Sequence, residues 1–141
     1  MGRTNDAIAE YMIAIKSNSN PKILYKIYYN LGIAYESIGL LDEALRAYEV
    51  SITMNPGYAE AYNNLGSIYG QKGMIAEAIK AFQASLKLNP NSAEIHNNLG
   101  IIYETLGATE KAKEEYKIAL RINPELESAR GNLERIIQNP P

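Results

Sequence analysis

A repeat of 34 residues is the feature that most constrains how this chain folds. When residues 25–58, 59–92 and 93–126 are aligned without gaps, the same residue types recur column by column. The tetrapeptide Asn-Asn-Leu-Gly, for example, occurs at 63–66 and again at 97–100. A unit of this length cannot bury its apolar face alone, so neighbouring units are expected to stack and bury a continuous core.

The columns shared by the three units are apolar, aromatic or small, and each unit closes with Asn-Pro. They hold Leu31, Leu65 and Leu99; Gly32, Gly66 and Gly100; Tyr35, Tyr69 and Tyr103; Gly39, Gly73 and Gly107; Ala44, Ala78 and Ala112; and Tyr48, Phe82 and Tyr116.

Each unit is predicted to contain two helices. In the middle unit, packing residues from Tyr62 to Tyr69 recur at i, i+3, i+4 and i+7, which is one face of a helix. Gly73 is expected to end this helix in the C′ position. The second helix should stop before Pro90, because the residue preceding a proline is pushed out of helical geometry. The full prediction is eight helices and no strand, with the helices near 4–17, 23–38, 42–55, 59–72, 76–89, 93–106, 110–123 and 127–138.

The repeat pattern resembles the tetratricopeptide repeat (TPR) family, whose signature is an aromatic residue, Leu-Gly, Tyr, Ala, an aromatic residue and Pro over 34 residues. Three copies within 25–126 carry it, and the phrase AEAYNNLG is similar to the repeats of the O-GlcNAc transferase subfamily. The opening aromatic is tyrosine or His96 where the family often has tryptophan. The resemblance implies an all-α, right-handed solenoid of helix pairs whose usual work is binding other proteins.

The ends of the chain depart from the full repeat. Residues 1–24 match a second helix only, with Ala7, Tyr11 and Ala14 in its columns and an insertion within Ser17–Lys22. We therefore expect a half repeat, as in a piece of a longer array. Residues 127–138 match a first helix, but Glu134 replaces the packing glycine, which is typical of a capping helix.

The glycine of Asn-Asn-Leu-Gly is expected to allow close helix packing. Gly66 lies on the packing face, and the small residues Ala78 and Ser85 occupy matching positions on the second helix. A larger side chain at Gly66 should overpack this joint, at about 1–3 kcal/mol.

Another set of positions on each first helix lines the concave groove in TPR proteins. Position 6 of the repeat is asparagine in all three repeats and in the last helix. We call these four residues the asparagine ladder: Asn30, Asn64, Asn98 and Asn132. An amide carries both a donor and an acceptor, as a peptide group does, so the ladder is predicted to hold an extended backbone. The alternative is that these amides bond to the neighbouring repeat and only stabilise the stack. The other candidate ligand-binding residues are Asn63, Asn97, Tyr29, Ser67 and Ile101.

The charge of the groove restricts its ligand. TPR proteins that bind the free carboxylate of heat-shock chaperones use Lys and Arg beside the Asn, and the corresponding columns here lack them. Lys26 and the distant Arg135 are the basic groove residues, so the preferred partner is predicted to be a neutral or basic extended segment. The acidic groove residues are Glu36, Glu60, Glu94 and Glu104.

Other function classes find little support. The formal charge of −2 argues against a nucleic-acid binder, and no apolar run reaches membrane-spanning length. With no cysteine, and with His96 as the single histidine, in the aromatic packing column, no metal site, cofactor or enzyme activity is expected. A cytoplasmic location is the default expectation. Two functions stay open: a groove that binds an extended peptide or protein segment, or a scaffold that self-associates weakly through residues 4–24.

Overall fold

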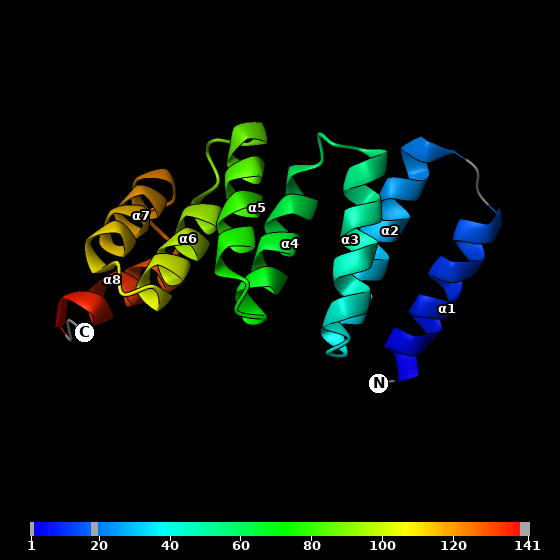
Figure 1. Ribbon diagram of the computed structural model, residues 1–141, viewed down its shortest axis with the longest axis horizontal. Helices are drawn as coiled ribbons and strands as arrows, with labels where there is room; N and C mark the ends of the chain where they lie inside the picture. The colour runs from blue at the N-terminus through cyan, green and yellow to red at the C-terminus, as the bar shows by residue number, and fades with distance from the viewer. Residues whose placement is uncertain (1, 18–19, 139–141) are drawn as a thin grey trace.

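The computed structural model describes residues 2–17 and 20–138, and these residues form eight α-helices and no strand, as predicted (Figure 1). The helices are α1 (Gly2–Ser17), α2 (Pro21–Ser37), α3 (Leu41–Met54), α4 (Ala59–Gln71), α5 (Ile75–Leu88), α6 (Ala93–Thr105), α7 (Thr109–Ile122) and α8 (Glu127–Gln138). No described helix has the length and apolar character that crossing a bilayer requires.

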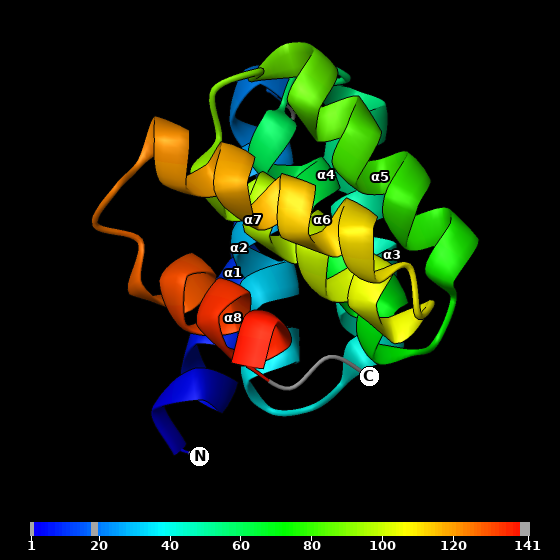
Figure 2. The same ribbon diagram turned by 90° about the vertical axis from the view of Figure 1, so that its left-hand side faces the viewer.

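The helices follow one another along the molecule in chain order, from α1 at one end to α7 and α8 at the other (Figure 1). Packing is most extensive within the pairs α2–α3, α4–α5 and α6–α7, and each pair also packs against the next. Viewed along this row, the successive pairs are rotated relative to one another (Figure 2). This arrangement confirms the predicted solenoid of stacked helix pairs.

The glycines and Asn-Pro pairs lie at the ends of the helices, as the sequence predicted. Gly39 has a φ of +78°, a left-handed conformation that suits glycine and closes the C-terminus of α2. Around it, the Gly39 N–H donates to the Glu36 carbonyl and the Leu40 N–H to the Tyr35 carbonyl, both at 3.0 Å. Helix α3 ends at Met54, and Asn55 leaves the helical conformation, with φ −139° and ψ 87°, directly before Pro56.

The packing glycines make room for the aromatic column. A Cβ atom added to Gly66 would lie 2.8 Å from the Phe82 ring, and one added to Gly32 would lie 2.5 Å from the Tyr48 ring. The joint is therefore tight, but the reason differs from the expectation, because an aromatic ring fills it. Ser85 acts elsewhere, since its hydroxyl donates to the Ala59 carbonyl at 2.7 Å.

Helix α1 lacks the cover that the other second helices have. Tyr48 and Tyr116 are fully buried, whereas their counterpart Tyr11 is only half-buried. Beside it, Met12 is 47% exposed and Ile13 is 66% exposed. The insertion predicted between α1 and α2 includes residues 18–19, which lie outside the described residues.

Helix α8 packs against α7 through a short apolar face. Ala129 and Ile136 are buried there, and Leu133 contacts the Tyr116 cluster. Glu134, which replaces the packing glycine, is exposed. The carboxylate is thus in solvent, away from any tight helix joint.

Candidate functional site

A pocket lies between α4 and α6, on the helix faces predicted to line the groove. Its volume is about 390 Å³, and Phe82 and Ile102 contribute apolar surface to it. Gly70 is part of its wall, so we call it the Gly70–Phe82 pocket. Three of the predicted groove residues, Ser67, Asn98 and Ile101, line this pocket, together with Gly70 and Gln71 of α4 and Thr105 of α6.

The asparagine ladder makes hydrogen bonds between successive repeats. The Asn98 side-chain nitrogen donates to Oδ1 of Asn63 at 3.3 Å, and that of Asn132 donates to Oδ1 of Asn97 at 3.1 Å. In both cases the ladder amide bonds to the residue 35 positions earlier. The amides therefore bond to the neighbouring helix, which is the contact that the stacking interpretation expects.

At the first step of the ladder, tyrosines take the place of the asparagine acceptor. The Asn64 side-chain nitrogen lies 3.3 Å from the Tyr29 hydroxyl and 3.2 Å from the Tyr48 hydroxyl, and donates to both. The Tyr29 ring also packs edge-on against Tyr58, with ring centroids 4.9 Å apart. Burial of the Tyr29 ring raises the pKa of its hydroxyl above the usual value, so it stays protonated near neutral pH.

The remaining candidate residues differ in their access to solvent. Asn30, at the start of the ladder, is exposed, and Ile101 is 43% exposed. Asn63 and Ser67 are half-buried. Asn97 is only 7% exposed, so it offers little surface to a ligand. Its side-chain oxygen instead accepts the hydrogen bond from Asn132.

Two of the four groove glutamates bond to buried tyrosines of the fold, and Glu94 accepts a hydrogen bond from the Ser92 hydroxyl at 3.2 Å. Glu36 accepts a hydrogen bond from the Tyr48 hydroxyl at 3.0 Å, and Glu104 accepts one from the Tyr116 hydroxyl at the same distance. Glu104 also pairs with Arg135 through both guanidinium nitrogens, one of them at 2.9 Å. This pairing lowers the pKa of the Glu104 carboxyl below its usual value and leaves Glu60 and Glu94 as the exposed acids of the groove.

The third repeat contains a pair that the sequence reasoning did not anticipate. His96 Nδ1 lies 2.7 Å from Oε2 of Glu115, and both side chains are less than one-fifth exposed. His96 is half-buried, as its column suggested, and the Glu115 carboxylate is largely shielded from solvent. Helices α6 and α7 are therefore joined by a polar contact between two columns in which the other repeats carry tyrosine and alanine. Within residues 2–17 and 20–138, no three metal-ligating side chains cluster together.

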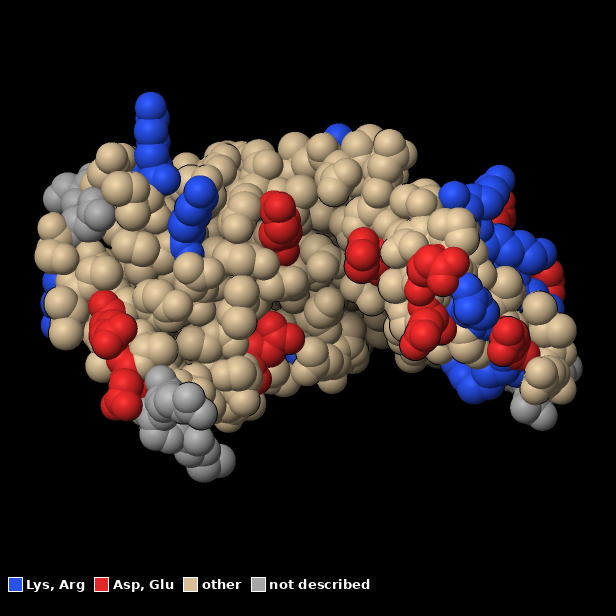
Figure 3. Space-filling view, turned by 180° about the vertical axis from the view of Figure 1, so that it is seen from behind, with Lys and Arg blue, Asp and Glu red and all other residues tan. Residues whose placement is uncertain are grey.

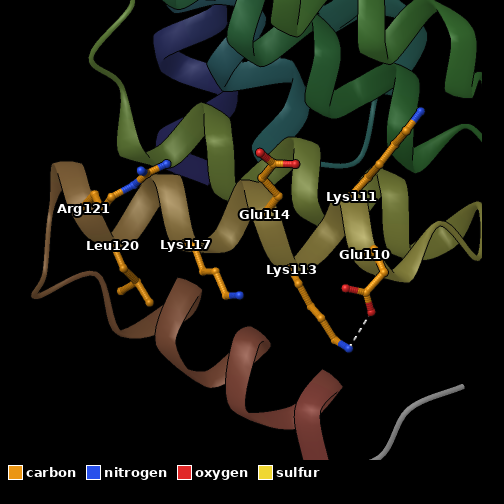
Figure 4. A pocket seen from close by; sticks show the side chains of 7 residues that line it. All are labelled: Glu110, Lys111, Lys113, Glu114, Lys117, Leu120 and Arg121. Atoms are coloured by element: carbon orange, nitrogen blue, oxygen red, sulfur yellow. Dashed lines mark hydrogen bonds and ion pairs between the residues drawn. The ribbon is translucent and has the colours of Figure 1, made fainter.

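A larger hollow, of about 780 Å³, is lined by side chains of α7 (Figure 4). Lys113, Lys117 and Leu120 point toward α8, and Lys113 pairs with Glu110 at 2.9 Å (Figure 4). Lys111 and Arg121 point the other way, and basic side chains gather at this end of the molecule (Figure 3). These basic side chains lie on a second helix, α7, and are therefore not among the groove positions predicted for the first helices.

Comparison with protein families agrees with the repeat spacing. Profiles described as tetratricopeptide repeat match residues 25–58, 47–80 and 93–126, and a profile described as TPR repeat matches residues 67–107. The chain belongs to the tetratricopeptide repeat family. Two of these matches, 25–58 and 93–126, have the same boundaries as two of the repeats aligned above.

Solved TPR structures resemble this chain over most of its length. Two structures of MamA superpose with TM-scores of 0.84 and 0.81 at 28% and 25% identity. Each match covers 97% of this chain, and 73% and 88% of the respective MamA chain. The first TPR domain of Spaghetti (RPAP3), bound to the HSP90 peptide SRMEEVD, superposes with a TM-score of 0.77 at 24% identity, covering 81% of this chain and 90% of that one. A comparison with curated protein sequences gave no match.

Proposed function

We propose that this TPR chain is a protein-interaction module that binds an extended segment of a partner protein in the groove formed by α2, α4, α6 and α8. The Gly70–Phe82 pocket carries this proposal, because it lies among the side chains that the repeat register assigned to the groove. TPR repeats are generally non-catalytic, and we assign the chain no reaction.

The asparagine ladder suits a ligand backbone even though its amides already bond to neighbouring repeats. An asparagine offers two N–H donors and a carbonyl acceptor. The inter-repeat bond of Asn98 uses one donor, which leaves the carbonyl and the second N–H for a peptide group. Stacking and ligand binding are therefore compatible, and the same bond fixes the orientation of the amide.

The charges favour a neutral or basic ligand. Glu60 and Glu94 are exposed along the groove, and Arg135, its one basic residue near α6, is paired with Glu104. An acidic segment would meet these carboxylates without a free guanidinium to balance them. The RPAP3 domain binds the acidic peptide SRMEEVD, so the preference proposed here differs from that of this structural relative.

The first experiment separates ligand binding from stacking. Linear peptides are selected from a phage-displayed library against the wild-type chain, and SRMEEVD serves as the acidic comparison peptide. The ladder is then changed to alanine at Asn30, Asn64, Asn98 and Asn132 together. Binding should fall by about tenfold or more, since each amide hydrogen bond contributes about 0.5–1.5 kcal/mol.

The control is Gln83→Ala, an exposed amide on α5, outside the first helices. It should leave both binding and melting temperature unchanged. Unchanged affinity of the folded quadruple variant, with reduced stability, would assign the ladder to stacking alone. Selection of acidic peptides would contradict the charge preference.

Self-association is the second candidate function, and the exposed apolar side chains of α1 favour it. Met12 and Ile13 are 47% and 66% exposed, beside the half-buried Tyr11. Such a surface gains from finding a partner. Sedimentation velocity over a concentration series should show weak dimers that Ile13→Glu abolishes, while Ile137→Glu at the far end has no effect. A monomer up to millimolar concentration would exclude this candidate.

A further inference from the structure

The Gly70–Phe82 pocket exists where the middle repeat departs from its neighbours at two columns. The first and third repeats hold a Glu–Tyr pair there, Glu36 with Tyr48 and Glu104 with Tyr116, joined by hydrogen bonds of 3.0 Å. The middle repeat has Gly70 and Phe82 instead. Both the carboxylate and the hydroxyl that fill this space in the other repeats are thus absent from the middle repeat.

The lost hydroxyl also changes the ladder. Asn64 bonds to the hydroxyl of Tyr48 at 3.2 Å in addition to Tyr29. Asn98 faces Phe82, which has no hydroxyl, and among the described side chains its partner is Asn63. Asn98 therefore keeps more hydrogen-bonding capacity than Asn64 or Asn132, and it lies at the rim of the pocket.

The lining gives the pocket an apolar interior and a polar edge. Phe82, Ile101 and Ile102 contribute aromatic and aliphatic surface, while Gln71, Asn98 and Thr105 contribute amides and a hydroxyl. Recognition sites for apolar groups have this composition, with a few polar groups that fix the orientation of the ligand. A volume of about 390 Å³ suits one bulky side chain with its backbone held at the edge.

The exposed acids place a charge at a defined distance from this pocket. Glu94 precedes Ile101 by seven residues on α6, a separation of about 10 Å along a helix that rises about 1.5 Å per residue. An extended segment advances about 3.3 Å per residue and would span this distance in about three to four residues. Side chains alternate along an extended segment, so a spacing of about four places both on the groove side.

We propose that the Gly70–Phe82 pocket anchors a single bulky apolar side chain of the bound segment. This inference rests on the proposed function, in which the groove binds an extended segment. The segment carries Leu, Met or Phe at this anchor and a Lys or Arg about four residues away, which pairs with Glu60 or Glu94. The anchor supplies affinity by burial of apolar surface, and the basic residue sets the direction of the segment in the groove.

The test fills the pocket with the chemistry of the neighbouring repeats. Gly70→Glu combined with Phe82→Tyr recreates the pair found in the first and third repeats. An added Cβ at Gly70 would lie 3.0 Å from the Cδ1 atom of Ile102. The same combination of Glu and Ile already occurs at Glu36 and Ile68, in the same columns one repeat earlier, so the fold should accept the change.

The probes are synthetic Gly/Ser peptides that contain one anchor, Leu, Phe or Ala, and a Lys or Glu four residues away. Wild-type protein should bind the Leu and Phe peptides about tenfold more tightly than the Ala peptide, as expected for burying one large apolar side chain. The double variant should bind all three alike. Comparing anchors within one variant removes the effect of the new charge on overall affinity.

A second variant keeps the test decisive if the double variant does not fold. Ile101→Ser alters a lining side chain that is 43% exposed and should reduce the preference for Leu over Ala by several-fold. Equal wild-type affinity for Leu, Phe and Ala peptides would overturn the anchor while leaving groove binding intact. No binding of any peptide, including those selected from the library, would overturn the proposed function as well. Tighter binding of the Glu peptides than of the Lys peptides would overturn the basic partner.

Discussion

Asn98 on α6 donates a side-chain hydrogen bond to Asn63 on α4 across the boundary between two repeats, with a nitrogen–oxygen distance of 3.3 Å. The same relationship joins Asn132 to Asn97, 35 residues apart in both cases. Repeats 59–92 and 93–126 carry asparagine at two adjacent positions, so the boundary between them and the boundary with α8 each receive one amide–amide contact. The ladder is thus a structural feature of the stack.

The Asn98–Asn63 bond should contribute measurably to stability. We expect Asn98→Ala to lower the free energy of unfolding by about 0.5–1.5 kcal/mol, and the Asn63→Ala and double variants to reveal a coupling between the two sites. Chemical denaturation of the four proteins measures this coupling. Asn30→Ala, at an exposed position in the same column, is the control and should change little. Full additivity of the two single changes would show that the bond contributes nothing.

The packing glycine provides the second prediction. A Cβ at Gly66 would lie 2.8 Å from the Phe82 ring, so Gly66→Leu should overpack the joint by about 1–3 kcal/mol. At about 4 °C per kcal/mol for a chain of this size, the melting temperature should fall by several degrees. Gly131→Ala is the matched control, since nothing lies within 4 Å of its added Cβ. That change should be neutral or stabilising, because alanine favours the helix more than glycine does. A neutral Gly66→Leu would refute this account of the joint.

Much of the fold could be predicted because the repeat presents the same signals three times. The left-handed Gly39 and the end of α3 before Pro56 both depend on local backbone chemistry, which the residue types determine directly. The observed helices begin and end within about two residues of the predicted positions, in line with the usual uncertainty of helix ends.

The pocket could not be predicted in the same way, because it arises from a difference between repeats. Treating Tyr48, Phe82 and Tyr116 as one aromatic column hides the missing hydroxyl. The signal was present in the sequence as a paired change, since Gly70 accompanies Phe82 where Glu36 accompanies Tyr48. Finding it requires knowing that these two columns touch, and the hydrogen bond from Tyr48 to Glu36 establishes that contact.

The same reasoning applies to the His96–Glu115 contact and gives the third prediction. The first two repeats hold Tyr28 with Ala47 and Tyr62 with Ala81 in these columns. Changing Glu115 to Ala alone removes the partner of a half-buried histidine and should cost about 1 kcal/mol. Adding His96→Tyr should restore the stability, because the pair then matches the other repeats.

Thermal melts of Glu115→Ala, His96→Tyr and the double variant at neutral pH give the melting temperatures that test this prediction. Recovery in the double variant is the expected result. A double variant as unstable as the sum of its parents would mean that the third repeat requires its polar pair.

The last prediction concerns acid stability at the boundary between α6 and α8. The Arg135 guanidinium holds the pKa of the Glu104 carboxyl below its ordinary value of 4.5, and the Tyr116 hydroxyl adds to this effect. A carboxyl whose pKa is lower in the folded state contributes stability at neutral pH and loses that contribution as the pH falls through the folded pKa. The stability difference between wild-type protein and Glu104→Gln should therefore be constant at neutral pH and shrink below about pH 4.5.

Equilibrium denaturation of both proteins from pH 3 to pH 7 measures this difference. Other carboxyls titrate in the same range, but their contributions cancel between two proteins that differ at one residue. Because the pair is partly exposed, the difference should be small and should diminish further in high salt. Asp42→Asn, which removes an exposed carboxyl that pairs with Lys72, provides a comparison for an ion pair without the tyrosine. A Glu104→Gln difference that stays constant down to pH 3 would contradict the assigned shift and the role of Arg135 in joining α8 to the third repeat.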